Sequence, residues 1–164
     1  MTLRALEPQD LDLLYTIENQ QEMWDVCDTN VPYSRFDLEQ YLLNQQHDIY
    51  ADKQLRLVAC NDEGKAVGLI DLFNFSPAHQ RAELGVAILR NEQGRGYATE
   101  ALRLLNDYAR SVLHLHQLYC IVPEDHAASL AMLRHAGFVP QTTLPDWLLT
   151  AEGYKDAVLL MYRV

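Results

Sequence analysis

Two glycines, Gly94 and Gly96, lie in a short turn between an apolar segment and an amphipathic one. Glycine adopts backbone angles that other residues avoid, and it lets a ligand approach the main chain without a side chain in the way. At the start of a helix the backbone N–H groups have no intrahelical partner, and the aligned peptide dipoles add roughly half a positive charge. The turn therefore predicts a binding site for a phosphate group.

The residues of this turn exclude two common phosphate-binding motifs. A Walker loop requires Gly, four residues and then Gly-Lys-Ser/Thr, and the sequence contains no such run. A dinucleotide-binding fingerprint requires a third glycine where Thr99 stands, in a repeating βαβ pattern near the start of the chain. ATP and NAD are therefore not the expected ligands. The turn instead fits the pattern Gln/Arg-x-x-Gly-x-Gly/Ala, with Gln93, Gly96 and Ala98 at the defined positions.

The segment after the turn has the pattern of a helix with one buried face. Its apolar residues recur at spacings of three and four. They are Ala98, Ala101, Leu102, Leu105, Tyr108, Ala109 and Val112. Polar residues such as Glu100 and Arg103 occupy another face. The helix is therefore expected to pack on a core and to hold its first amides in place at the turn.

The turn resembles the diphosphate-binding loop of the GNAT superfamily, the acyl-CoA-dependent N-acyltransferases. The resemblance implies acetyl-CoA as the cosubstrate and direct transfer of the acetyl group to a bound amine, with no covalent enzyme intermediate. The acceptor would be a polyamine, another small primary amine or a protein N-terminus. One alternative is a glycine-rich turn without a ligand. Another is a non-catalytic acyl-CoA sensor or assembly subunit.

The order of the predicted elements agrees with this resemblance. We expect strands at residues 3–6, 55–60, 66–75, 81–89, 117–122, 139–149 and 156–162. We expect helices from residue 8 to about 17, over 34–46, from the turn to about 112, and over 127–136. This order predicts an α+β domain around a mixed sheet. It is the order of the GNAT fold, a mostly antiparallel sheet with a central splayed pair of parallel strands, flanked by helices.

By resemblance, the cofactor lies between the parallel strands at residues 81–89 and 117–122. The pantetheine arm would pair with main-chain groups of Val86, Ala87 and Ile88. The diphosphate would lie on the residues of the turn, which are Gln93, Gly94, Arg95, Gly96, Tyr97 and Ala98. The Arg95 side chain either adds positive charge there or points to solvent.

A second stretch that resembles the family lies between His126 and Phe138. Many relatives have Asn-x-x-Ser/Ala, then a tyrosine that protonates the leaving thiolate, and then Gly-Phe. Here His126 stands in place of the asparagine and Leu133 in place of the tyrosine. Ser129 matches a serine that faces the sulfur in the branch resembling ribosomal-protein alanine acetyltransferases. We therefore expect His126 and Ser129 at the cofactor, with Ser129 as proton donor unless its hydroxyl only bonds a nearby carbonyl.

Acetyl transfer to an amine also requires a base. An alkylamine with a pKa near 10.4 must lose a proton at pH 7, which costs roughly 4.6 kcal/mol without help from the site. Glu83 lies on the strand beside the expected cofactor, where several relatives carry a glutamate base, and we assign it this role. The alternative is an exposed strand glutamate paired with Arg81 or a lysine. Asp71 and Tyr119 are the reserve candidates.

The acceptor site is expected to include residues from the segment 22–34, EMWDVCDTNVPYS. It is spaced like the amine-site segment of the spermidine acetyltransferase group, which this part of the chain resembles. That group has adjacent acids before its Pro-Tyr pair, whereas Asn30 and Val31 stand there in this chain. We assign substrate contacts to Trp24, Asp28, Tyr33, Glu83 and Tyr119. The two aromatic residues of the segment either form a cation–π wall or only pack together.

Length and charge set further limits. The 164 residues suffice for one domain, residues 1–164, and are few for two. The formal net charge is -10 with no basic cluster, which argues against nucleic acid binding. An acidic surface attracts cations such as amines, although it also serves ordinary solubility. No apolar run is long enough for a bilayer and no signal peptide is evident, so we expect a cytoplasmic protein without a membrane span.

Cysteines and histidines do not suggest a metal or redox site. Cys27, Cys60 and Cys120 are scattered, and Cys120 in an apolar strand is expected to pack as a small hydrophobe. His114 and His116 lack a third ligand nearby, so we expect no metal. Exposed edges of the last two strands, residues 139–149 and 156–162, would allow a homo-oligomer without requiring one.

Overall fold

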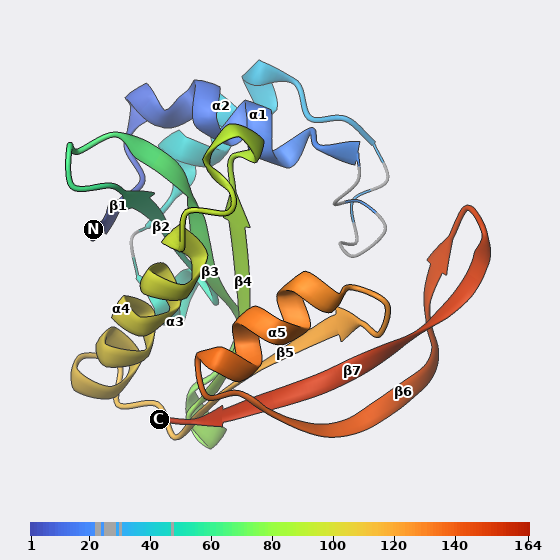
Figure 1. Ribbon diagram of the computed structural model, residues 1–164. Helices are drawn as coiled ribbons and strands as arrows, with labels where there is room; N and C mark the ends of the chain where they lie inside the picture. The colour runs from blue at the N-terminus through green and yellow to red at the C-terminus, as the bar shows by residue number, and fades with distance from the viewer. Residues whose placement is uncertain (22–23, 25–28, 30, 47) are drawn as a thin grey trace.

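A seven-stranded mixed sheet runs through the described part of the chain, with its strands in the order β1-β2-β3-β4-β5-β7-β6 (Figure 1). The computed structural model describes residues 1–21, 24, 29, 31–46 and 48–164. The strands are β1 (Thr2–Ala5), β2 (Leu55–Cys60), β3 (Ala66–Ser76), β4 (Arg81–Ile88), β5 (Gln117–Pro123), β6 (Val139–Thr150) and β7 (Gly153–Arg163). Neighbours are antiparallel except for the central pair β4 and β5, which is parallel. The predicted fold class is therefore confirmed.

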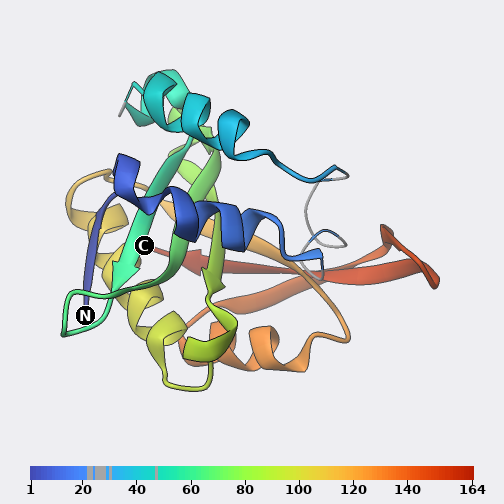
Figure 2. The same ribbon diagram turned by 90° about the horizontal axis from the view of Figure 1, so that it is seen from above.

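Helices cover both faces of this sheet. The helices are α1 (Leu11–Glu18), α2 (Arg35–Asn44), α3 (Ile49–Asp52), α4 (Tyr97–Ser111) and α5 (Ala127–His135). Short 3-10 turns lie at η1 (Pro8–Asp10), η3 (Pro77–His79) and η4 (Arg90–Glu92). Helices α1 and α2 lie over one face, and α4 and α5 over the other (Figure 2). None of the described helices combines the length and the apolar character that crossing a bilayer would take.

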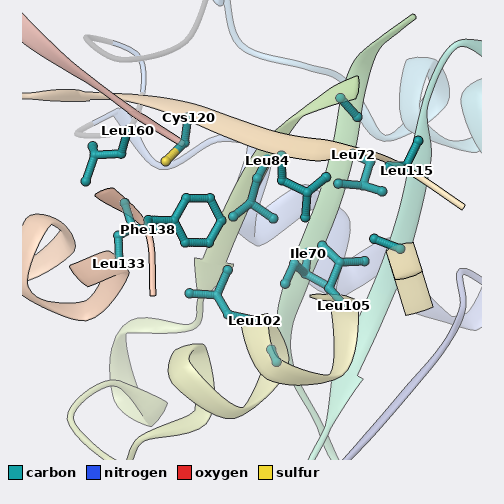
Figure 3. Packing of buried hydrophobic residues seen from close by; sticks show 14 of the residues in the cluster. Ile70, Leu72, Leu84, Leu102, Leu105, Leu115, Cys120, Leu133, Phe138 and Leu160 are labelled. Carbon is teal, nitrogen blue, oxygen red and sulfur yellow. The ribbon is translucent and has the colours of Figure 1, made fainter. Parts of the chain in front are cut away.

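The core on the α4 and α5 face is the larger of two apolar clusters. Leu102 and Leu105 of α4 are fully buried, as the helical periodicity predicts, and lie near Ile70, Leu84 and Phe138 (Figure 3). Full burial of a side chain of this size stabilises the fold by about 1.5–3 kcal/mol. This packing fixes α4 against β3 and β4, and with it the turn at the start of α4.

Several element boundaries differ from the predicted ones for local reasons. The α2 helix begins one residue after Ser34, because the Ser34 hydroxyl accepts a hydrogen bond from the Asp37 amide and caps the helix. The four-residue helix α3 was not predicted, since one turn shows no periodicity. Strand β7 begins at Gly153, three residues earlier than expected, directly after a tight turn.

The prediction of two exposed terminal strands is wrong for β7. This strand pairs with β5 on one side and β6 on the other, so it lies inside the sheet. The edges of the sheet are β1 and β6. The far end of the β6–β7 hairpin projects from the body of the protein (Figures 1 and 2).

Candidate active site

The parallel strands β4 and β5 separate after three residue pairs. Arg81, Ala82 and Glu83 pair with Gln117, Leu118 and Tyr119. Both strands lie wholly within the described residues, and no further pair joins them, although β4 continues to Ile88 and β5 to Pro123. The splay that the resemblance implied is therefore present. It leaves main-chain groups of β4 without a partner strand on the β5 side.

Val86, Ala87 and Ile88, the residues predicted to meet the pantetheine arm, lie beyond the last β4–β5 pair. The side chain of Val86 packs against the apolar cluster on the α4 face and that of Ala87 against the cluster on the α1 face, while Ile88 is buried. A ligand between the strands can thus contact these residues through their peptide groups.

The turn before α4 has the conformation that glycine permits. Gly94 has φ 76° and Gly96 has φ 82°, and a side chain at either would enter open space. Glycine is needed here because of the backbone angles, and the open surroundings leave room for a ligand.

The first amides of α4 are free to bind such a ligand. Gly96 caps the helix without a side-chain hydrogen bond, and the first helical bond runs from the Glu100 amide to the Gly96 carbonyl. Within the described residues no acceptor bonds the amides of Tyr97, Ala98 or Thr99. These donors point out of the helix start, as an anion site requires.

Side chains below the turn hold it in place. The side-chain amide of Gln93 donates a hydrogen bond of 3.0 Å to the Ile88 carbonyl, so this motif residue connects the turn to the end of β4. Glu92 is buried and accepts a hydrogen bond from the Lys65 ammonium, and the Arg95 guanidinium lies 3.1 Å from its other oxygen. The hydrogen bond from Lys65 and the charge of Arg95 lower the pKa of Glu92. Arg95 therefore neutralises Glu92 in this structure, a contact the sequence pattern did not predict.

Glu83, the predicted base, lies at the point where β4 and β5 separate. Its Oε2 accepts a hydrogen bond of 2.8 Å from the side-chain amide of Asn74. The alternative prediction, an ion pair between Glu83 and Arg81, is not seen between these two described residues. Tyr119 is its register partner on β5. Burial and the negative charge of Glu83 raise the pKa of Tyr119, so this phenol stays protonated near neutral pH.

Asp71, a reserve base, is held by Arg56. The guanidinium donates from Nε and Nη2 to the two carboxylate oxygens of Asp71, at 2.9 and 2.8 Å, and from Nη1 to Glu18 at the end of α1. Burial alone would lower the pKa of Arg56, but the charges and hydrogen bonds of the two carboxylates raise it. Asp71 is therefore engaged in an ion pair with Arg56, whereas Glu83 accepts a hydrogen bond from a neutral side chain.

The Asn19 side chain joins the end of α1 to Tyr33, near the end of the segment predicted to bind the acceptor. The side-chain amide of Asn19 donates to the Tyr33 carbonyl at 3.1 Å and accepts from the Tyr33 amide at 2.9 Å. The Trp24 indole donates to the Glu18 carbonyl, so it packs at the end of α1. The Tyr33 side chain is exposed. Asp28 lies outside the described residues.

The start of α5 brings His126 and Ser129 together. His126 caps the helix, since its Nδ1 accepts a hydrogen bond of 3.2 Å from the Ser129 amide. Among the described residues no carbonyl accepts a hydrogen bond from the Ser129 hydroxyl. Leu133 is buried at 3% exposure in the core, next to Phe138 (Figure 3), so it supplies no polar group.

Glu83 and the helix that carries Ser129 lie on opposite faces of the sheet. Leu84, the neighbour of Glu83, packs in the cluster that contains α5, and successive strand residues point to opposite faces. Glu83 therefore faces the α1 side, together with Asp71 and Tyr119, while Ser129 belongs to α5.

Metal ligands do not cluster in the part of the chain that the structure describes. No group of three or more His, Cys, Asp or Glu side chains could hold an ion there. His114 lies in a turn with φ 51°, between α4 and β5.

Cys120 is expected to be unreactive, because burial and the nearby charge of Glu83 raise the pKa of its thiol to about 12. At pH 8 only about one molecule in ten thousand would then carry the thiolate, the nucleophilic form. In a Cys27→Ser background, Cys60 and Cys120 should react with a disulfide reagent at least about 100-fold more slowly in the native protein than in guanidinium. Rapid native labelling of Cys120 with loss of activity would instead point to a covalent cysteine intermediate.

Comparison with known proteins agrees with this geometry. A family described as acetyltransferase (GNAT) domain matches residues 1–139. The spermidine N(1)-acetyltransferase of Escherichia coli K12 is 30% identical over 156 residues, covering 95% of this chain and 82% of the relative. A putative ribosomal N-acetyltransferase of Bacillus subtilis is 28% identical over 162 residues, covering 96% and 88%.

A solved structure has the same fold over nearly the whole chain. It is the spermidine N-acetyltransferase of Vibrio cholerae in complex with CoA and spermine, with a TM-score of 0.86 and 26% identity, covering 99% of this chain and 94% of that one. The family match over most of the chain, together with the splayed strands and the open amides at the start of α4, shows that this chain belongs to the GNAT family of acetyltransferases.

Proposed function

We propose that this protein transfers an acetyl group from acetyl-CoA to a primary amine while both are bound. The observation that carries the proposal is the continuity of two features. The unpaired stretch of β4 leads directly into a turn whose helix amides have no partner within the described residues. The first suits the amide-bearing arm of the cofactor and the second suits its diphosphate.

The binding residues follow from this placement. Peptide groups of Val86, Ala87 and Ile88 would hold the arm, and the amides at Gly94 to Ala98 would hold the diphosphate. Gln93 and His126 act indirectly, because Gln93 fastens the turn to β4 and His126 caps α5. Acetyl-CoA supplies the thioester that is attacked.

The proton transfers are assigned to residues on the two faces of the sheet. Glu83 takes a proton from the bound ammonium, which restores the lone pair of the amine. The amine nitrogen then bonds to the carbonyl carbon, which leaves it positively charged with a second proton to lose, and the carbon–sulfur bond breaks. The Ser129 hydroxyl gives its proton to the thiolate and takes up the second proton of the nitrogen through water, so that the serine is restored and the products are the amide, the free thiol and protonated Glu83. Removing a proton from an amine of pKa near 10.4 at pH 7 costs roughly 4.6 kcal/mol, which explains the need for a nearby carboxylate.

Ser129→Ala is expected to lower kcat by roughly 10-fold, less than the roughly 100-fold or more of a typical proton donor, because a thiolate is a good leaving group. Calorimetry should give an unchanged affinity for CoA. Ser111→Ala is a suitable control, since Ser111 is exposed at the far end of α4 and its hydroxyl bonds only the Asp107 carbonyl. Full activity of the Ser129 variant would remove this residue from the mechanism.

Polyamines are the first acceptors to test, because the E. coli and V. cholerae relatives are named for spermidine. We propose that Trp24, Tyr33, Glu83 and Tyr119 contact the acceptor, together with Asp28. The described site holds one carboxylate without an arginine partner, Glu83, whereas Arg56 neutralises Glu18 and Asp71. A single amine therefore suits the described part of the site, and a peptide N-terminus is a second candidate.

The deciding experiment is an acceptor panel. The protein is incubated with acetyl-CoA and with polyamines, amino acids or N-terminal peptides, and free thiol is followed. Acceptor-dependent thiol release is the expected result. Tight CoA binding with no release for any acceptor would favour the alternative, a non-catalytic acyl-CoA sensor or assembly subunit.

We also propose that residues 1–164 form one domain, because a single sheet includes strands from both ends of the chain.

Self-association is proposed through the projecting β6–β7 hairpin, where Trp147, Leu149 and Tyr154 are exposed and β6 is an open edge. A cytoplasmic location is supported by the two free, buried cysteines, Cys60 and Cys120.

A further inference from the structure

Asn74 occupies an irregular position in β3, beside the predicted base. Its φ is 48°, in the left-handed region that asparagine tolerates better than most residues. Between the pairs Phe73–Glu83 and Ser76–Arg81, β3 has two residues, Asn74 and Phe75, where β4 has one, Ala82. This is a β-bulge, and the extra residue changes which side chains face the core.

The bulge directs Asn74 away from the core and toward Glu83. Ile70, Leu72 and Phe75 all pack in the cluster on the α4 face, although strict alternation would place residue 74 there and residue 75 on the opposite face. Asn74 is instead exposed, and its Nδ2 donates to Glu83 Oε2 at 2.8 Å. A backbone conformation that few residues adopt therefore serves to place one amide group on one carboxylate.

The surroundings of Glu83 show what this hydrogen bond does. The titratable groups nearest to it are Arg81 on its own strand and Tyr119 and Cys120 on β5. Tyr119 and Cys120 are neutral near pH 7, since burial and the carboxylate raise their pKa values. Asp71, two positions along β3 from Phe73, is occupied by Arg56. The Asn74 amide is thus a neutral hydrogen-bond donor that holds one oxygen of Glu83.

We propose that Asn74 is a positioning residue for Glu83. Its amide holds Oε2 in place and leaves Oε1 to accept the proton of the amine. The inference rests on the proposed function of Glu83, but the hydrogen bond and its effect on titration can be measured without an acceptor.

The test compares Asn74→Gly and Asn74→Asp with the parent protein. Glycine accepts the left-handed backbone and removes the amide. Aspartate keeps the shape and the tolerance of this conformation but replaces the donor with a second carboxylate. The control is Gln80→Gly, which makes the same change at a residue with the same φ of 48°, at the η3 turn between β3 and β4.

The primary readout is the titration of the Glu83 side chain by carbon-13 NMR, with its resonance assigned by Glu83→Gln. We expect the midpoint to move to higher pH by roughly half a unit in Asn74→Gly and by about one unit or more in Asn74→Asp, because a like charge adds to the lost donor. Gln80→Gly should titrate like the parent protein. Unchanged midpoints in both Asn74 variants would overturn the proposal.

The kinetic readout separates positioning from a merely structural role. The acidic limb of the pH profile of kcat/KM, measured with spermidine or the acceptor that the panel identifies, should move by the same amount as the NMR midpoint, with unchanged CoA affinity. A loss of rate without a shift of this limb would also overturn the proposal. If the midpoints shift but Glu83→Gln is fully active, the hydrogen bond acts as inferred and it is the role of Glu83 as base that fails.

Discussion

Gly96→Glu is expected to abolish CoA binding, lowering the affinity at least about 100-fold. The new carboxylate would stand at the start of α4, where the amides of Tyr97, Ala98 and Thr99, which no acceptor of the described segments bonds, form the proposed diphosphate site. Hydrogen bonds to a charged group are worth about 1.5–3 kcal/mol each, so losing even one or two, with added repulsion, produces an effect of this size. Isothermal calorimetry with CoA measures it directly.

Gly64→Glu is a matched control for this variant. Gly64 has φ 79°, nearly the same as the 82° of Gly96, and a side chain there also enters open space. Both variants carry the same added charge at a glycine of nearly equal φ, but Gly64 lies in the β2–β3 turn, outside the residues of the proposed diphosphate site. Undiminished CoA affinity in a folded Gly96→Glu protein would show that the diphosphate does not bind at this turn.

Glu83→Gln is expected to lower kcat by about 10- to 1000-fold, at the lower end of the roughly 100- to 10,000-fold that a general base usually contributes. The amide of glutamine is close to the carboxylate in shape but cannot take a proton from the amine. Affinity for CoA should stay unchanged, because Glu83 faces the α1 side of the sheet. Steady-state kinetics of thiol release, with calorimetry of CoA binding, separates the two effects.

Glu63→Gln provides the control for charge alone, since Glu63 is exposed in the β2–β3 turn. It should leave kcat at the parent value. A fully active Glu83→Gln enzyme would assign the base to water or to a residue outside the described segments, while the acetyltransferase class would stand.

The features that depend on local sequence could be predicted well. The positive φ angles at Gly94 and Gly96 follow from residue type, and the buried face of α4 follows from spacings of three and four. The β2–β3 turn with Gly64 is likewise a local pattern. The placement of Glu83 at the splayed strands could not be predicted from local sequence patterns alone. It came from the family resemblance and not from any periodicity.

The contacts that tune the site could not be predicted, because they join residues far apart in the chain. Arg56 bonds Asp71 on the next strand and Glu18 on α1, and Lys65 reaches Glu92 from another turn. The bulge at Asn74 was also not predicted, since one extra residue in an apolar strand does not change its composition noticeably. A polar residue interrupting the alternation of a strand was the available signal.

The hydrogen bonds between Asn19 and Tyr33 have a consequence for how this enzyme can diversify. They fix both ends of the intervening segment to each other at the exit of α1, independently of what lies between. In the acceptor site proposed above, substitutions inside the segment would then alter acceptor preference without moving β4, β5 or the turn before α4. Under that proposal, the amine that is recognised can change between related proteins while the proposed CoA-binding residues stay the same.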